Sequence, residues 1–204
     1  MKRIAVAALG AALICTAPGM AQSSDTPVTN RDTPGLPDYL VPVDQALPGG
    51  LMNDPTDMSW THYGDALSSE FIVDESYPGG GAAMRMVMSD SGEIHDGGMN
   101  IPLLGKVDRG DRITIGFFAR MIETSSDDGL AKVGVRFQQN VDPYPGFGEK
   151  VVDVAQGWGW YEVTAIADRN IRRDGIVALQ FGLTEQTVEI GQVVVVSGTR
   201  TIAG

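Results

Sequence analysis

Cysteine is nearly absent from this chain of 204 residues, whose one cysteine is Cys15. Because Cys15 lies in an N-terminal segment that we expect to be cleaved, the mature protein is predicted to have neither a disulfide bond nor a catalytic thiol. Its fold must then be stabilised by the burial of apolar side chains alone. A lipoprotein signal at Cys15 is an alternative, although Ile14 stands where such signals have a small residue.

Basic residues are scarce as well, since 15 Lys and Arg stand against 26 Asp and Glu and give a net charge of −11. Nucleic acid and anionic membrane surfaces are bound through Lys and Arg, so this balance argues against both as partners. Long apolar runs are also missing. The apolar stretch from Ile4 to Ala17 is too short to span a membrane, which takes about 20 residues.

Residues that commonly carry catalysis are few. The two histidines, His62 and His95, lack the spacing of metal ligands, and no Gly-x-Ser-x-Gly elbow occurs. The glycine run 79–81 has no lysine of a phosphate loop. The acidic run 90–96 offers oxygens to a structural calcium ion, but acidic turns are usually just solvated, and the solvated turn is the favoured interpretation. We therefore expect no cofactor and favour a function without catalysis.

The N-terminal region divides into two segments. Lys2 and Arg3, the apolar stretch after them and the small-x-small sequence ending at Ala21 predict a signal peptide over residues 1–21, and hence a secreted or periplasmic protein. Prolines at 27, 34, 37, 42 and 48 then predict an extended Pro-rich linker over residues 22–48. Its one apolar spot, residues 39–41, leaves open that the segment docks instead.

The remaining residues, 49–204, are predicted to form one domain composed of strands. Turn sequences rich in Gly, Pro and Asp separate apolar and alternating segments, and no window of ten residues has a convincing helical period. The expected strands are 69–73, 83–89, 99–104, 111–122, 132–140, 149–154, 160–167, 175–184 and 187–196. This order predicts an all-β fold, an antiparallel β-sandwich or jelly roll.

Five short motifs follow one another through this domain. They are Gly50 to Pro55 followed by Trp60 and Gly64, Pro78 to Arg85, Lys106 to Arg120, Trp160 to Val163, and Thr187 to Val193. Their order resembles that of carbohydrate-binding modules of families four and nine. The resemblance implies a β-sandwich of the galactose-binding-domain-like type that binds a polysaccharide or glycan. Gly191-Gln192 replaces the aspartate that family members often have near a structural calcium, so the resemblance does not carry that calcium over.

Strand alternation predicts where a ligand would bind. In residues 133–138 the apolar side chains fall on one face, and Gly134, Arg136 and Gln138 fall on the other. Applied to the neighbouring strands, the same alternation places Arg85, Phe118, Arg120, Arg136, Gln138 and Gln180 opposite the core. Arginine and glutamine suit sugar hydroxyls or uronic carboxylates, and the small residues Gly134, Ala178 and Gly182 are expected to leave room for a chain.

Aromatic rings are the second requirement, because the apolar face of a pyranose stacks on an aromatic plane. The candidate platforms are Trp158, between two glycines, Tyr144, in the loop 142–148, and Phe118 on the polar face. That loop could instead cap the sandwich. Trp60 is expected in the core, and Trp160 is expected to pack against the edge of its strand.

The leading hypothesis is an exported, non-catalytic carbohydrate-binding protein. Two alternatives for the polar face are ordinary solvated residues paired with acids such as Glu162, and burial against another subunit. A structural or assembly protein of the envelope would use the sandwich for protein contacts. A jelly-roll polysaccharide lyase would use Arg136, Gln138, Gln180, His95 and Tyr144, although the dense strand motifs of such lyases are missing.

Overall fold

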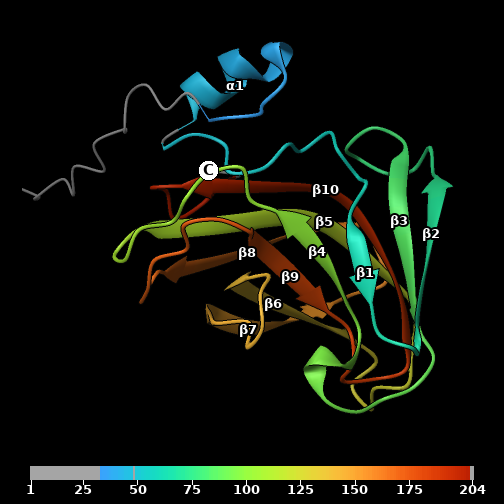
Figure 1. The fold of residues 1–204 in the computed structure, drawn as a ribbon. Coiled ribbons are helices and arrows are strands. Elements are labelled where there is room, and N and C mark those ends of the chain that lie inside the picture. Colours follow the sequence, from blue (N-terminus) through green and yellow to red (C-terminus); the bar gives the residue numbers. More distant parts are fainter. Residues whose placement is uncertain (1–32, 48, 203–204) are drawn as a thin grey trace, which may run out of the picture.

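Two antiparallel sheets of five strands each form the two layers of the molecule (Figure 1). The computed structural model describes residues 33–47 and 49–202, so the predicted signal peptide and the linker residues 22–32 and 48 lie outside the described residues. In spatial order, the first sheet consists of β1 (Thr61–Tyr63), β4 (Gly98–Pro102), β9 (Gly175–Gln180), β6 (Ala131–Gln139) and β7 (Gly146–Val154). We call it the β6 sheet.

The second sheet, called the β5 sheet below, has the long strands β5 and β10 side by side near its centre. Its order is β2 (Leu67–Val73), β3 (Ala82–Met88), β10 (Gln186–Ser197), β5 (Arg112–Thr124) and β8 (Gly159–Ile166). The predicted all-β sandwich is confirmed, and each expected strand overlaps an observed one. The short strand β1 is an addition, because three residues are too few to show an alternating pattern.

The core lies between the sheets and is filled by the apolar positions of the alternating strands. Val133, Val135 and Phe137 of β6 are fully buried, as are Ile115 and Phe117 of β5. The burial of each such side chain contributes about 1.5–3 kcal/mol. Trp60 is also in the core, as predicted, with 8% of its surface exposed.

The segment 33–47 is packed against the domain and is not extended. It forms a 3-10 turn, η1 (Asp38–Leu40), and a short helix, α1 (Val41–Ala46), which lies beyond β10 in Figure 1. Pro42 falls in the first turn of α1, where proline is tolerated because that N–H has no helical partner. The expectation of an extended linker is therefore wrong for these residues, and the docking alternative holds.

Both apolar and polar contacts fix this segment. Leu40 packs with Leu51 and Val196 in a small cluster separate from the main core. The buried Asp44 carboxylate accepts hydrogen bonds from the Leu51 backbone N–H at 2.6 Å and from the Thr33 hydroxyl at 3.3 Å. Val196 belongs to β10, so the segment covers part of the β5 sheet. Within residues 33–47 and 49–202, no helix has the length and apolar character that crossing a bilayer requires.

Candidate functional site

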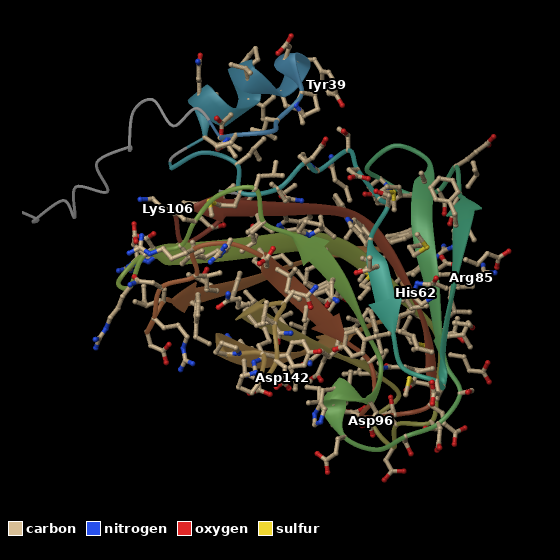
Figure 2. All side chains as sticks on the ribbon, viewed as in Figure 1. Tyr39, His62, Arg85, Asp96, Lys106 and Asp142 are labelled. Carbon is tan, nitrogen blue, oxygen red and sulfur yellow. The ribbon has the colours of Figure 1, made fainter. Side chains whose placement is uncertain are left out.

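A groove of about 480 Å³ lies on the outer face of the β6 sheet. Four strands of this sheet supply polar side chains to the groove, and the loop after β6 forms one side of the groove. Its lining includes Tyr63, His95, Asn100, Arg136, Gln138, Tyr144 and Gln180. In Figure 2, Asp96 and Asp142 mark two chain segments that border this groove.

The register of the β6 sheet arranges these residues in rows across the strands. One row runs from Tyr63 on β1 through Gly98 on β4 and Gln180 on β9 to Gly134 on β6. The next row has Asn100, Ala178 and Arg136 on β4, β9 and β6. Large polar residues therefore alternate with small ones across the sheet. This alternation leaves a floor on which each polar side chain can lie over a small neighbour.

Two glycines provide the space for groove side chains. A Cβ at Gly98 would lie 2.6 Å from the Tyr63 hydroxyl oxygen and 2.9 Å from the Leu179 carbonyl oxygen, so the Tyr63 ring occupies the place of a side chain there. A Cβ at Gly146 would lie 2.7 Å from Nε of Arg136. The Arg136 side chain thus crosses β7 at Gly146 and reaches the loop that carries Tyr144.

The expectation that Gly134 and Gly182 leave room for a ligand is wrong. A Cβ at Gly134 would lie 2.5 Å from Cδ1 of Ile94, and one at Gly182 would lie 2.1 Å from the Glu93 carbonyl oxygen. Both residues face the segment of the 3-10 turn η2 (Ile94–Asp96). The two glycines therefore seat one wall of the groove, the wall that carries His95.

Two buried side-chain oxygens belong to residues that line the groove. Oδ1 of Asn100 and Oε1 of Gln180 are almost completely covered, and neither accepts a hydrogen bond from the part of the chain that the structure describes. An unpaired buried polar atom costs about 1–3 kcal/mol, so native structures rarely keep one without a water molecule or ligand. Because both residues line the groove, a change of side-chain rotamer would bring either oxygen to the hydroxyl group of a ligand.

Tyr63 contributes a protonated phenol to the same row. Nε2 of Gln180 donates to its hydroxyl oxygen at 3.4 Å. Burial raises the pKa of Tyr63 above its ordinary value of 10, while the hydrogen bond from Gln180 and the charge of Arg136 oppose that shift. The phenol is therefore neutral at physiological pH, and it can donate its own proton to a ligand.

The loop after β6 supplies an aromatic rim. Tyr144 is 47% exposed and has a positive φ of 56°, and its carbonyl oxygen accepts a hydrogen bond from Nη2 of Arg136 at 3.3 Å. The next aromatic residue, Phe147, is buried and stacks on Phe137 in the core with the ring centroids 5.5 Å apart. The loop therefore rims the groove with the exposed ring of Tyr144 and also caps the sandwich with the buried ring of Phe147.

Four of the predicted binding residues lie on the other sheet. The alternation correctly places Arg85, Phe118 and Arg120 outside the core, but β3 and β5 belong to the β5 sheet, whereas β6 and β9 belong to the β6 sheet. Trp158 lies with that second group, because its ring is 4.8 Å from the Arg120 guanidinium carbon. The expectation of one shared face is therefore wrong. Arg136, Gln138, Gln180 and Tyr144 are the residues that the groove brings together.

The arginines of the β5 sheet take part in a ladder of alternating charges across its strands. Glu70, Arg85, Glu189 and Arg120 are register neighbours on β2, β3, β10 and β5. The fully buried Glu189 carboxylate accepts from Nη2 of Arg85 and from Nε of Arg120, each at 2.6 Å. Arg120 also bonds to Asp74. The paired-arginine alternative therefore describes these two residues, with Glu189 as the partner.

The aromatic residues of that sheet pack on one another. Phe118 meets Tyr77 with ring centroids 5.5 Å apart and Trp160 at 4.9 Å, and Tyr77 meets Trp158 at 4.8 Å. Trp160 also lies across Gly116, where a Cβ would be 2.1 Å from its ring. Each ring thus covers the β5 sheet, and Trp158 lies away from the groove.

Metal ligands do not gather in the described residues, where no three His, Cys, Asp or Glu side chains come close enough to bind a metal ion. In the acidic run 90–96, the Asp90 carboxylate accepts from the Ser91 N–H and the Asp96 carboxylate from the Glu93 N–H. These two carboxylates stabilise local turns.

Asn100 and Tyr63, which both line the groove, are not among the predicted binding residues, for different reasons. Asn100 lies within a predicted strand and alternates with the buried Met99 and Ile101, so the alternation argument used for β6 would have found it. Tyr63 lies in the short β1, where no pattern is visible, and only the pairing of β1 with β4 brings it to the groove.

Comparison with known proteins finds solved structures of the same architecture. No family model and no curated protein matches the sequence. Among solved structures, the chain is similar over 75% of its length to the second N-terminal cellulose-binding domain of Cellulomonas fimi β-1,4-glucanase C, of which it covers 94% (TM-score 0.50, 17% identity). The chain has the fold of a carbohydrate-binding module.

A second structure of this fold is larger. The chain is similar over 76% of its length to the CBM22-1–GH10 modules of Clostridium thermocellum endo-1,4-β-D-xylanase 10B, complexed with xylohexaose (TM-score 0.51, 13% identity). It spans 29% of that xylanase chain. The carbohydrate-binding-module sandwich that the motifs imply is therefore confirmed as a fold, without a choice among the families that share it. A shared fold does not determine a ligand, which has to be argued from the groove.

Proposed function

We propose that this protein binds a glycan chain, without catalysis, in the groove of the β6 sheet. The observation that supports this most is the pair of buried oxygens on Asn100 and Gln180, which accept no hydrogen bond within residues 33–47 and 49–202. A sugar hydroxyl donates to such an oxygen and removes the cost of leaving it unpaired. Tyr63 and Arg136 supply donors beside these acceptors, so the groove matches the mixed donors and acceptors of a saccharide.

Tyr144 is the stacking residue in this proposal. Its ring is exposed at the groove, and its backbone is bonded to Arg136. A pyranose ring placed against it would bury its apolar face while its hydroxyls reach the polar floor. The cellulose-binding and xylohexaose-bound structures of the same fold agree with a saccharide ligand.

We include export in the proposal, because the protein would encounter polysaccharides outside the cytoplasm. The support is the sequence of residues 1–21, in which a charged start, an apolar stretch and a small-x-small site follow one another. The mature protein is then expected to begin at Gln22, and its N-terminal sequence after expression in the native host tests this.

Replacement of Gln180 by alanine is expected to weaken glycan binding by about ten- to a hundredfold, because it removes one acceptor and one donor from the groove floor. A glycan array first identifies bound saccharides, and affinity electrophoresis with those polysaccharides then measures retention. The exposed Gln156, in the connection between β7 and β8, provides the matched control, and Gln156→Ala should bind like the wild type. Lack of retention on every polysaccharide, with a stable complex recovered from envelope extract, would favour the assembly function instead.

A polysaccharide lyase is the second candidate, because the groove gathers all five residues considered for one, His95 and Tyr144 included. In β-elimination, Arg136 would neutralise a uronate carboxylate while a base removes the proton at C5. The C4–O bond breaks, C4 and C5 form a double bond, and the leaving oxygen takes a proton. Growing ultraviolet absorbance during incubation with polygalacturonate or alginate would establish this activity, and a flat trace would exclude it for these substrates.

A further inference from the structure

We infer that the glycan is anionic and that Arg136 binds its acidic group. This inference rests on the proposed function and adds the chemical class of the ligand. The distribution of charge supports an anionic ligand. The chain has 26 acidic residues and a net charge of −11, yet the residues lining the groove include Arg136 and His95 and no Asp or Glu. An anion in this groove therefore meets no carboxylate among the lining residues, although the chain as a whole is acidic.

Arg136 differs from Arg85 and Arg120, two arginines on strands of the other sheet, in its charged partners. Arg85 and Arg120 are committed to the buried Glu189. Arg136 makes no ion pair with any carboxylate of residues 33–47 and 49–202, and its one hydrogen bond there, at 3.3 Å, goes to the neutral carbonyl oxygen of Tyr144. Its side chain is half-buried. A guanidinium has five N–H donors in a planar fork, so most of its donors are available to a ligand.

The chemistry of an acidic sugar matches the rest of the floor. A carboxylate binds a guanidinium through two parallel hydrogen bonds that are about twice as strong as neutral ones. The hydroxyls of the same sugar donate to Oδ1 of Asn100, which lies in the same row as Arg136. An acidic sugar residue can therefore donate a hydroxyl hydrogen bond to Oδ1 of Asn100 and pair its carboxylate with the Arg136 guanidinium. A neutral sugar leaves the charge of Arg136 without a counterion.

The nearest carboxylates along the chain are at the border of the groove. Asp96 follows His95, and its carboxylate accepts the Glu93 N–H. Asp142 precedes Pro143 and is exposed. Solvent screens the charges of both carboxylates. Each therefore has a smaller effect on the attraction between Arg136 and an anion than a carboxylate inside the groove would have.

The test compares each acidic glycan with its neutral counterpart. Polygalacturonate and alginate are measured by affinity electrophoresis beside the same polymers with their carboxyl groups reduced to alcohols, and a sulfated dextran is measured beside dextran. The native uronates are expected to bind about tenfold or more tightly than the reduced polymers. Arg136→Gln should remove most of that preference. The exposed Arg109, in the turn between β4 and β5, gives the matched control, and Arg109→Gln should keep it.

The outcomes separate this inference from the proposed function. Equal binding of native and reduced polymers, lowered in both by Gln180→Ala, overturns the anionic ligand and leaves glycan binding intact. No binding to any polymer, native or reduced, overturns both. A preference for sulfated dextran over dextran, lost in Arg136→Gln and absent for the uronates, keeps the anion and assigns it as a sulfate. Thermal unfolding of each variant shows that the fold is retained.

Discussion

Replacement of Glu189 by alanine is expected to lower the free energy of unfolding by about 3–5 kcal/mol. The fully buried Glu189 carboxylate bonds to two arginines, through Nε and Nη2 of Arg85 at 2.9 and 2.6 Å and through Nε of Arg120 at 2.6 Å. Without it, two guanidinium groups face each other across β10 with no charge between them. Urea denaturation of the wild type and the variant measures the difference.

Glu70 provides the matched control for this prediction. It is the outer acid of the same ladder, its side chain is 69% exposed, and its carboxylate is 3.7 Å from Arg85. Solvated ion pairs of this kind contribute about 0–1 kcal/mol, so Glu70→Ala should be nearly neutral. Equal effects of the two substitutions would mean that burial of Glu189 is not what makes the ladder stabilising. Glycan binding by folded Glu189→Ala should be unchanged, because the groove is on the other sheet.

Asn53→Ala is expected to cost about 2–4 kcal/mol, because it leaves two buried backbone groups of β10 unpaired. Nδ2 of Asn53 donates to the Val193 carbonyl oxygen at 2.9 Å, and Oδ1 accepts the Val195 N–H at 2.7 Å. These bonds lie next to the register shift between Ile190 and Val193, where β10 is irregular. Asn53 belongs to the opening motif of the domain, so this contact gives that motif a structural role.

Asn170 is the control for the second prediction. It is exposed, and its Oδ1 accepts a hydrogen bond from the Arg109 N–H at 2.8 Å. In Asn170→Ala, water can accept that hydrogen bond instead. Its expected cost is below about 1 kcal/mol. The midpoint of chemical denaturation, followed by tryptophan fluorescence, distinguishes the two variants. A loss at Asn53 no larger than that at Asn170 would contradict the role assigned to the buried amide.

The sequence predicts which side chains face the core but not which sheet a strand joins. Alternation in residues 113–121 and 133–138 is unambiguous, and the buried residues Ile115 and Phe137 lie where it places them. Two strands with the same alternation can lie in either layer, and the short connection from β5 to β6 crosses between the layers. Arg120 and Arg136 are therefore both outside the core and on opposite faces of the molecule.

Contacts between distant segments determine the other features that the sequence does not predict. Nothing local in the sequence around Glu189 indicates that it is fully buried, because its partners are 104 and 69 residues away. The prolines predict an extended linker, whereas Leu40 docks against Val196, a residue more than 150 positions away in the sequence, which no local pattern indicates. The groove shares this property, since Tyr63 and Gln180 meet only through the pairing of β1 with β4 and of β4 with β9.

Ligand is expected to bind on the β6 sheet and not on the β5 sheet. An NMR titration of ¹⁵N-labelled protein with oligogalacturonate, and separately with its carboxyl-reduced form, distinguishes the two sheets. The side-chain amide signals of Asn100, Gln138 and Gln180 should shift with at least one of the two ligands, while the Nε–H signals of Arg85 and Arg120 stay in place. Shifts confined to those two arginines, with the three amides unmoved, would contradict the assignment of the site.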